Sequence, residues 1–163
     1  MAQTLIDGIY YNLDSGSGTA EVTSVPSGSS EYSGSISIPE KVTYGGATYS
    51  VTSIGDNAFF YCTSLTSITI PNSVTSLWSA CFADCARLES IEVESGNTVY
   101  DSRENCNAII QTSLNTMIAG CKNTTIPNSV TSLGSDCFEG WTGLTSITIP
   151  NSAPRLEDGC FSY

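Results

Sequence analysis

An internal repeat is the feature that most constrains this chain. Residues 65–73 recur letter for letter at 144–152, and residues 125–133 repeat residues 69–77. The residue before each repeated proline, or before Glu94 where the proline is replaced, marks the register at Ile38, Ile70, Val93, Ile126 and Ile149. The marks are 32, 23, 33 and 23 residues apart. The unit is therefore 23 residues long, two units carry insertions, and the period predicts a stack of similar units.

Each unit predicts a short strand, a turn, a second extended piece and one helical turn. Ile68 and Ile70 alternate with polar residues, so they point to one side of a strand. Pro71 cannot donate to a ladder and ends that strand. Residues 56–62 begin with capping side chains and continue with apolar ones, which predicts the helical turn. One such unit buries too little apolar surface to offset its ordering entropy, so the units must stack into a solenoid.

Charge and composition exclude several classes of function. Five Lys and Arg residues face 16 Asp and Glu, the net charge is -11, and there is no histidine. Phosphate backbones and anionic lipid surfaces are repelled, so we expect no nucleic-acid partner. Without histidine the chain lacks the usual general base and the commonest zinc ligand. We therefore expect no enzyme activity, no cofactor and no metal.

Hydrophobic stretches are short throughout. The longest uninterrupted apolar stretch is residues 58–62, far below the roughly 20 residues that span a bilayer. The first four residues lead into no signal-peptide core. We therefore expect no membrane insertion, and no signal peptide within this sequence.

The repeated pattern resembles a known family. Leu-Thr-Ser-Ile-Thr-Ile-Pro-Asn-Ser-Val-Thr-Ser-Leu, followed by Ala or Cys and then Phe, is similar to the 23-residue leucine-rich repeat of BspA-like bacterial surface proteins. The resemblance covers about residues 36–163. It implies a leucine-rich-repeat solenoid, mostly β, with a parallel sheet on the concave side and helical turns on the convex side. It also implies an extracellular or cell-surface location and adhesion to host matrix proteins or other cells.

Two regions are expected along the chain. Residues 1–35 lack the repeat and predict an N-terminal β-hairpin cap, because alternating apolar residues flank the turn sequence Asp14–Gly18. Residues 36–163 form the solenoid, with hairpin insertions near 40–51 and 94–122. The last repeat is incomplete, which leaves an apolar end open to self-association or to a longer chain's continuation.

The seven cysteines are read mainly as core residues. Five of them occupy repeated positions where small buried side chains are needed. Cys62 and Cys85, like Cys137 and Cys160, are 23 residues apart, so neighbouring layers bring them close. In the second insertion a disulfide between Cys106 and Cys121 is geometrically possible if Gln111 pairs with Thr116.

Strand alternation predicts the candidate binding face. If the repeated isoleucines are buried, the alternate side chains line the concave face: Ser67, Thr69, Ser90, Glu92, Asn123, Thr125, Ser146 and Thr148. A ladder of small polar side chains also keeps a sheet soluble without binding anything. The outward residues of the turns vary between units and offer a second candidate surface.

Taken with what the family resemblance implies, these features predict a non-enzymatic, cell-surface or secreted module that binds a protein ligand, such as a host extracellular-matrix protein. The alternative is a structural spacer whose repeats have no ligand of their own. The carboxylates, including Asp101 and Glu104, are expected to be solvated surface charges.

Overall fold

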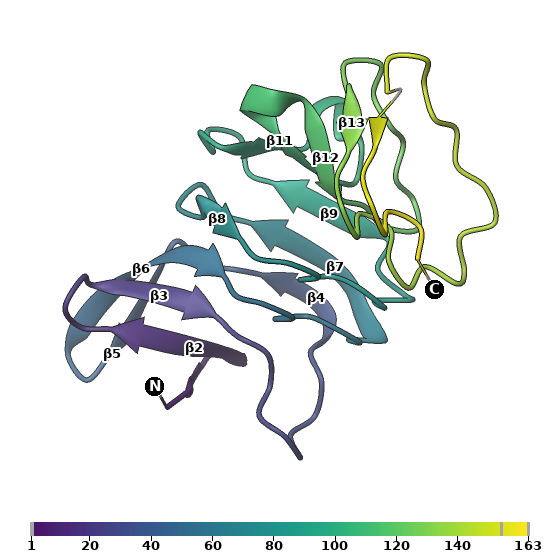
Figure 1. Cartoon of the computed structure of the whole chain (residues 1–163). Helices are drawn as coiled ribbons and strands as arrows, with labels where there is room; N and C mark the ends of the chain where they lie inside the picture. The colour runs from purple at the N-terminus through teal and green to yellow at the C-terminus, as the bar shows by residue number, and fades with distance from the viewer. Residues whose placement is uncertain (1, 154, 163) are drawn as a thin grey trace.

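The computed structural model describes residues 2–153 and 155–162. In Figure 1 the N-terminal strands lie at the lower end, the C-terminal segment lies at the upper right, and β4, β7 and β9 lie between them. The described part of the chain is almost entirely strands and turns. It has a mostly-β fold, as the sequence predicts.

The first sheet joins the N-terminal segment to the first repeat. Its strands are β1 (Thr4–Ile6), β2 (Ile9–Asp14), β3 (Thr19–Val22), β5 (Lys41–Tyr44), β6 (Ala47–Ile54) and β8 (Ser76–Leu77). β2 and β3 are antiparallel, with Leu13 opposite Ala20, whereas β3 is parallel to β6 and β6 is parallel to β8. The two regions expected from the sequence therefore share one sheet.

The second sheet contains the first strand of three successive units. These strands are β4 (Ser33–Ser37), β7 (Ser64–Ile70) and β9 (Ser90–Val93), and both pairs are parallel. Ile68 lies between Ile36 and Ile91 in the ladder. The 23-residue spacing from Ile68 to Ile91 is thus the step from one strand to the next.

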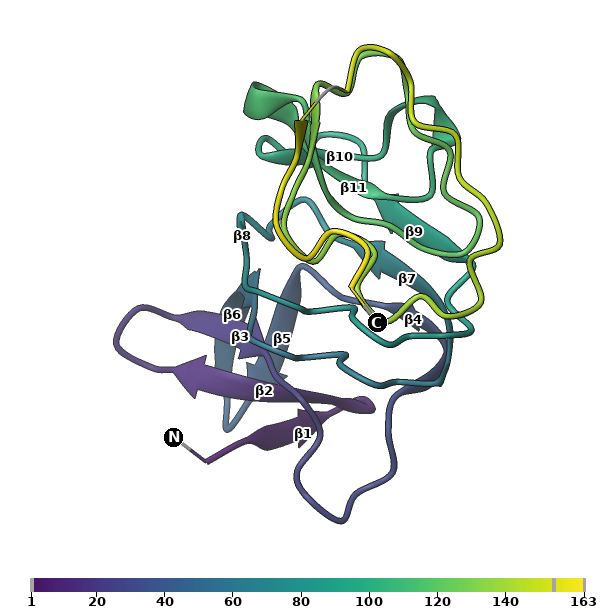
Figure 2. The same cartoon turned by 45° about the vertical axis from the view of Figure 1, so that its right-hand side comes forward.

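The third sheet combines the second insertion with the last units. It contains β10 (Tyr100–Asp101), β11 (Ile109–Gln111), β12 (Thr116–Ala119), β13 (Ser132–Leu133) and β14 (Arg155–Leu156). The 3-10 turns η1 (Arg103–Asn105) and η2 (Thr112–Leu114) lie within the insertion. β12, β13 and β14 are parallel, and Figure 2 shows the last two units running side by side.

The prediction of a helical turn in each unit is wrong, because within the described residues these segments contain turns but no helix. In four of the five units the segment after the second strand contains a left-handed residue at one repeated position: Asn57, Ala80, Asp136 and Gly159, with φ of 54°, 50°, 58° and 71°. Tyr61, Asp84 and Gly140 are left-handed again four residues later. Because an α-helix needs consecutive right-handed residues, these positions divide the segment into separate turns. Their backbone groups bond between units instead, as in the 2.9 Å bond from the Phe59 N–H to the Cys81 carbonyl.

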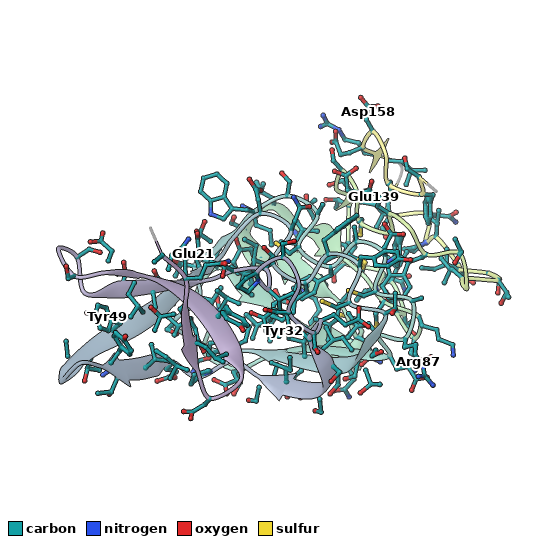
Figure 3. All side chains as sticks on the ribbon, turned by 90° about the horizontal axis from the view of Figure 1, so that it is seen from below. Glu21, Tyr32, Tyr49, Arg87, Glu139 and Asp158 are labelled. Atoms are coloured by element: carbon teal, nitrogen blue, oxygen red, sulfur yellow. The ribbon has the colours of Figure 1, made fainter. Side chains whose placement is uncertain are left out.

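Aromatic rings stack in the core behind these turns. Phe59 and Phe82 lie 5.4 Å apart between ring centroids, and Phe138 and Phe161 lie 5.3 Å apart. Tyr32, which Figure 3 shows in the middle of the molecule, packs on Phe59 at 4.9 Å. The third unit has Gly120 at the equivalent position, so its layer contributes no ring. A Cβ added to Gly120 would lie 2.2 Å from the Phe138 ring.

The disulfide that the sequence leaves possible between Cys106 and Cys121 is absent from this structure, where both residues are buried free thiols. Gln111 lies opposite Thr116, which is the pairing that the expectation assumed. A bulge between Ile109 and Ile110 then shifts the register, so that Ile109 lies opposite Ala119. This shift takes Cys106 out of alignment with Cys121.

Candidate binding surfaces

Four of the eight predicted binding residues lie together on the second sheet. Ser67 pairs with Ser90 and Thr69 pairs with Glu92 across β7 and β9. Ser35 and Ser37 extend the two rows onto β4, and the hydroxyls of Ser35 and Ser67 are hydrogen-bonded. The serines and Thr69 are half-buried or exposed, and Glu92 is exposed. We call these six residues the sheet face.

The other four predicted residues are exposed but lie outside the strands. Asn123 and Thr125 precede Pro127, and Ser146 and Thr148 precede Pro150, in segments without a strand ladder. Ile149, whose equivalents in earlier units are buried, is 37% exposed. The 23-residue period therefore does not extend the strands of the sheet face into the last two units.

Sequence reasoning missed a cavity at the third unit. There the chain passes from Gly120 to Lys122 in two residues, whereas the second unit uses six, from Phe82 to Leu88. The Lys122 N–H donates to the Leu88 carbonyl, so the chain has already returned to the strand side. The shortened turn leaves a cavity of about 220 Å³ between the turns of the second and fourth units. Its lining includes Trp78, Ser79, Tyr100, Gln111, Ser135 and Asp136.

A second hollow adjoins the first at Trp78. It is lined by Gln3, Asn12, Glu21, Thr23, Ser24, Gly55, Asp56 and Trp78, and its volume is about 370 Å³. The Asp56 carboxylate accepts a 3.1 Å hydrogen bond from the Ser79 N–H. The Ser53 hydroxyl donates to Glu21 at 3.2 Å. The Asn12 side-chain oxygen is buried and has no hydrogen-bond partner among the described residues. We call Trp78 with these two hollows the Trp78 surface.

The charges around these surfaces are mostly uncompensated. Three of the five cationic side chains already form ion pairs: Arg103 with Asp101 at 2.6 Å, Lys122 with Glu89 at 3.5 Å, and Arg155 with Glu157 at 2.9 Å. Burial, together with repulsion from Asp136 and Asp84, raises the pKa of the Glu139 carboxyl. Additional positive charge is therefore favourable beside this part of the molecule.

Comparison with known proteins identifies the repeat. Residues 30–163 match the model of the BspA-type leucine-rich repeat region in six copies. The chain belongs to this family. No curated protein matches the chain. Within the described residues, no helix is both long and apolar enough to cross a membrane.

Solved structures of bacterial leucine-rich-repeat proteins are similar to this BspA-type chain. One from Bacteroides ovatus is 26% identical with a TM-score of 0.60, covering 97% of this chain and 38% of its own. One from Eubacterium ventriosum is 25% identical with a TM-score of 0.61, covering 78% and 32%. A leucine-rich cell surface protein from Faecalibacterium prausnitzii shares the fold at 22% identity, with a TM-score of 0.51 and coverage of 99% and 52%. The chain thus spans about a third of the length of the first two.

Proposed function

We propose that this chain is a non-enzymatic, protein-binding module of a bacterial cell-surface or secreted protein. Membership of the BspA-type repeat family supports this role, and one structural neighbour is described as a cell surface protein. The stacked units form a solenoid, and its parallel sheet presents the docking surface. The partner is a protein, of which host extracellular-matrix proteins are the first to test.

The sheet face is the observation that carries the proposal. Ser35, Ser67 and Ser90 form one row across three strands, and Ser37, Thr69 and Glu92 form another. The side chains are small, so a partner can approach the strands closely. Each offers a hydrogen-bond donor or acceptor. The backbone beneath is fixed by the ladder, so docking costs little conformational entropy.

The test is saturable binding to immobilised fibronectin and fibrinogen by the wild-type chain and by a Thr69→Arg variant. Arginine adds bulk and charge at the centre of the sheet face without entering the core. Thr75→Arg is the matched control, because Thr75 is exposed and outside the sheet face. We expect binding that Thr69→Arg weakens at least about tenfold, which is 1.4 kcal/mol, and that Thr75→Arg preserves.

The alternative is a spacer whose repeats bind nothing. The hydroxyls of Ser35 and Ser67 favour the spacer, because they are hydrogen-bonded to each other rather than free to bond to a partner. Absence of saturable binding by the wild-type chain to either matrix protein would support the spacer. Equal binding by wild type and Thr69→Arg would move docking away from the sheet face.

A further inference from the structure

Trp78 occupies a position that the repeat does not require to be aromatic. The equivalent residues in three other units are Gly55, Gly134 and Glu157. The Trp78 N–H donates to the Ile54 carbonyl, a bond that any residue but proline can make. The indole is 55% exposed, although burying it would be favourable. The fold therefore gives no reason for a tryptophan at this position. Its position between two hollows suits a role in binding.

The size of the cavity favours a side chain over a larger molecule. Its 220 Å³ lies below the roughly 300–1,000 Å³ of pockets that hold drug-sized ligands. The bond from the Asp84 N–H to the Glu139 carbonyl joins the turns of the second and fourth units directly. One projecting side chain of a partner, laid against the indole, fits this space.

Charge determines which side chain fits. Glu21 and Asp56 line one hollow and Asp136 lines the other, while none of the five Lys and Arg residues lines either. None of these three carboxylates forms an ion pair within residues 2–153 and 155–162. In Figure 3, Glu139 and Asp158 lie toward the upper right of the view, Glu21 lies near mid-height on the left, and Arg87 lies toward the lower right. The surface is therefore negative as well as aromatic.

Several hydrogen-bond acceptors line the two hollows. The carboxylates accept, and the buried Asn12 oxygen lacks a donor. A guanidinium group matches all these features, since it is cationic, stacks on aromatic faces and donates several hydrogen bonds without accepting any.

We propose that the Trp78 surface binds an arginine side chain within a basic segment of a protein partner. Stacking of the guanidinium on the indole supplies the contact, and Glu21, Asp56 and Asp136 supply the charge. The proposal rests on the proposed protein-binding role, but it concerns a surface separate from the sheet face.

The probe is a short peptide of alternating glycine and arginine, and its control contains citrulline, which is the uncharged counterpart of arginine. Trp141 is the second tryptophan of the chain and is only 3% exposed. A Trp141→Phe variant therefore leaves Trp78 as the sole tryptophan reporter. We expect the arginine peptide to shield Trp78 from acrylamide quenching and the citrulline peptide to leave it accessible. Calorimetry on the wild-type chain gives the affinity without relying on that variant.

Two variants test the assignment of the residues. Trp78→Gly introduces the residue found in two equivalent units, so folding is preserved, and we expect about a tenfold loss of affinity. Asp136→Asn retains tolerance of the left-handed backbone while removing the charge, and we expect a loss of several-fold. Glu40→Gln is the control, because Glu40 is exposed and lines neither hollow.

Equal affinity for the two peptides, or unchanged affinity in Trp78→Gly, would overturn the proposal. Thr69→Arg should leave peptide binding unaltered. If the wild-type chain binds matrix proteins but not the arginine peptide, that result would count against the Trp78 surface alone. If the wild-type chain binds the arginine peptide but neither matrix protein, that result would count against the sheet face alone.

Discussion

At the scale of single residues, Ala80 has a left-handed backbone conformation, which the Cβ of alanine disfavours. Its φ is 50°, and the equivalent residue in the last unit is Gly159. A left-handed alanine costs about 1–2 kcal/mol, whereas glycine loses about 0.5–1 kcal/mol more backbone entropy on folding. We expect Ala80→Gly to raise the free energy of unfolding by about 0.5 kcal/mol. Urea denaturation measures the change.

The control for Ala80 is Ala86→Gly. Ala86 is exposed, and its φ is not positive. Glycine brings only its entropic penalty there, so we expect a loss of about 0.5–1 kcal/mol. A destabilised Ala80→Gly variant would show that the left-handed position is not strained.

Burial also controls the reactivity of the cysteines. It raises the pKa of Cys81 and Cys85 to about 12, and that of Cys62 and Cys106 to about 11. A hydrogen bond from Cys137 instead lowers the pKa of Cys160. Cys160 is itself only 4% exposed, but since only thiolates react, we expect it to be the fastest thiol at about pH 8 and all seven to react after unfolding. A disulfide-exchange reagent followed by absorbance measures this, and Cys160→Ser should remove the fast phase. Rapid labelling of Cys81 in the folded chain would contradict the prediction.

At the scale of the element, Gly120 permits the shortened third unit. A Cβ there would lie 2.2 Å from the Phe138 ring, and both residues are buried. The Gly120 N–H also donates to the Cys137 carbonyl, so the backbone has little freedom to move away. We expect Gly120→Ala to lower stability by about 2–3 kcal/mol. The double variant with Phe138→Leu should recover part of that loss; no recovery would mean that the ring is not the obstacle.

Glu31 links the loop before β4 to the start of β7 by hydrogen bonds. Its carboxylate accepts hydrogen bonds at 3.0 Å from the Thr63 N–H, the Thr63 hydroxyl and the Ser64 hydroxyl. Burial acts to raise the pKa of Glu31, but these hydrogen bonds outweigh it and hold the pKa below its usual range. The folded pKa is therefore lower than the unfolded one, which is about 4.3. The resulting stability is present above the unfolded pKa and is lost as pH falls through the folded pKa.

The measurement is the midpoint of thermal unfolding between about pH 6 and pH 3. We expect Glu31→Gln to flatten the acid part of this profile relative to the wild-type chain. Glu40→Gln is the matched control, because no hydrogen bond to the Glu40 side chain exists within the described residues. Superimposable profiles for wild type and Glu31→Gln would refute the prediction.

The same elements show how far the sequence predicts the structure. The 23-residue period predicts the repeat family, and it brings Ser67 opposite Ser90. It does not predict the left-handed turns. Asn57, Asp136 and Gly159 are of the residue types that favour a positive φ, but they are also common where helices begin and end, so the position is interpreted from the sequence as the start of a helical turn. The cavity was missed because the sequence does not show that Gly120 is equivalent to the phenylalanines of the other units. That equivalence is visible only in the structure, from the hydrogen bond between the Gly120 N–H and the Cys137 carbonyl. A search for exposed aromatic residues at positions that are glycine in other units would have found Trp78.

At the scale of the whole molecule, the net charge of -11 opposes folding and favours the proposed partner. Carboxylates brought together in a compact chain repel one another over distances that salt screens. The Debye length falls from about 30 Å at 0.01 M to about 8 Å at 0.15 M ionic strength. Added NaCl should therefore stabilise the fold while it weakens binding of the arginine peptide. Because salt is expected to raise stability and lower peptide affinity, a loss of binding in salt cannot be attributed to unfolding of the chain.

We expect the unfolding midpoint to rise with NaCl, by about 2–4 °C for each kcal/mol of repulsion that is screened. Differential scanning calorimetry across a salt series measures it. The double variant Glu40→Gln and Glu104→Gln removes two exposed charges far apart in the sequence. Since repulsion scales with the product of the charges, this variant should start from a higher midpoint and gain less from salt. An equal gain in both proteins would assign the salt effect to hydrophobic burial, which salts also strengthen, rather than to the excess of carboxylates.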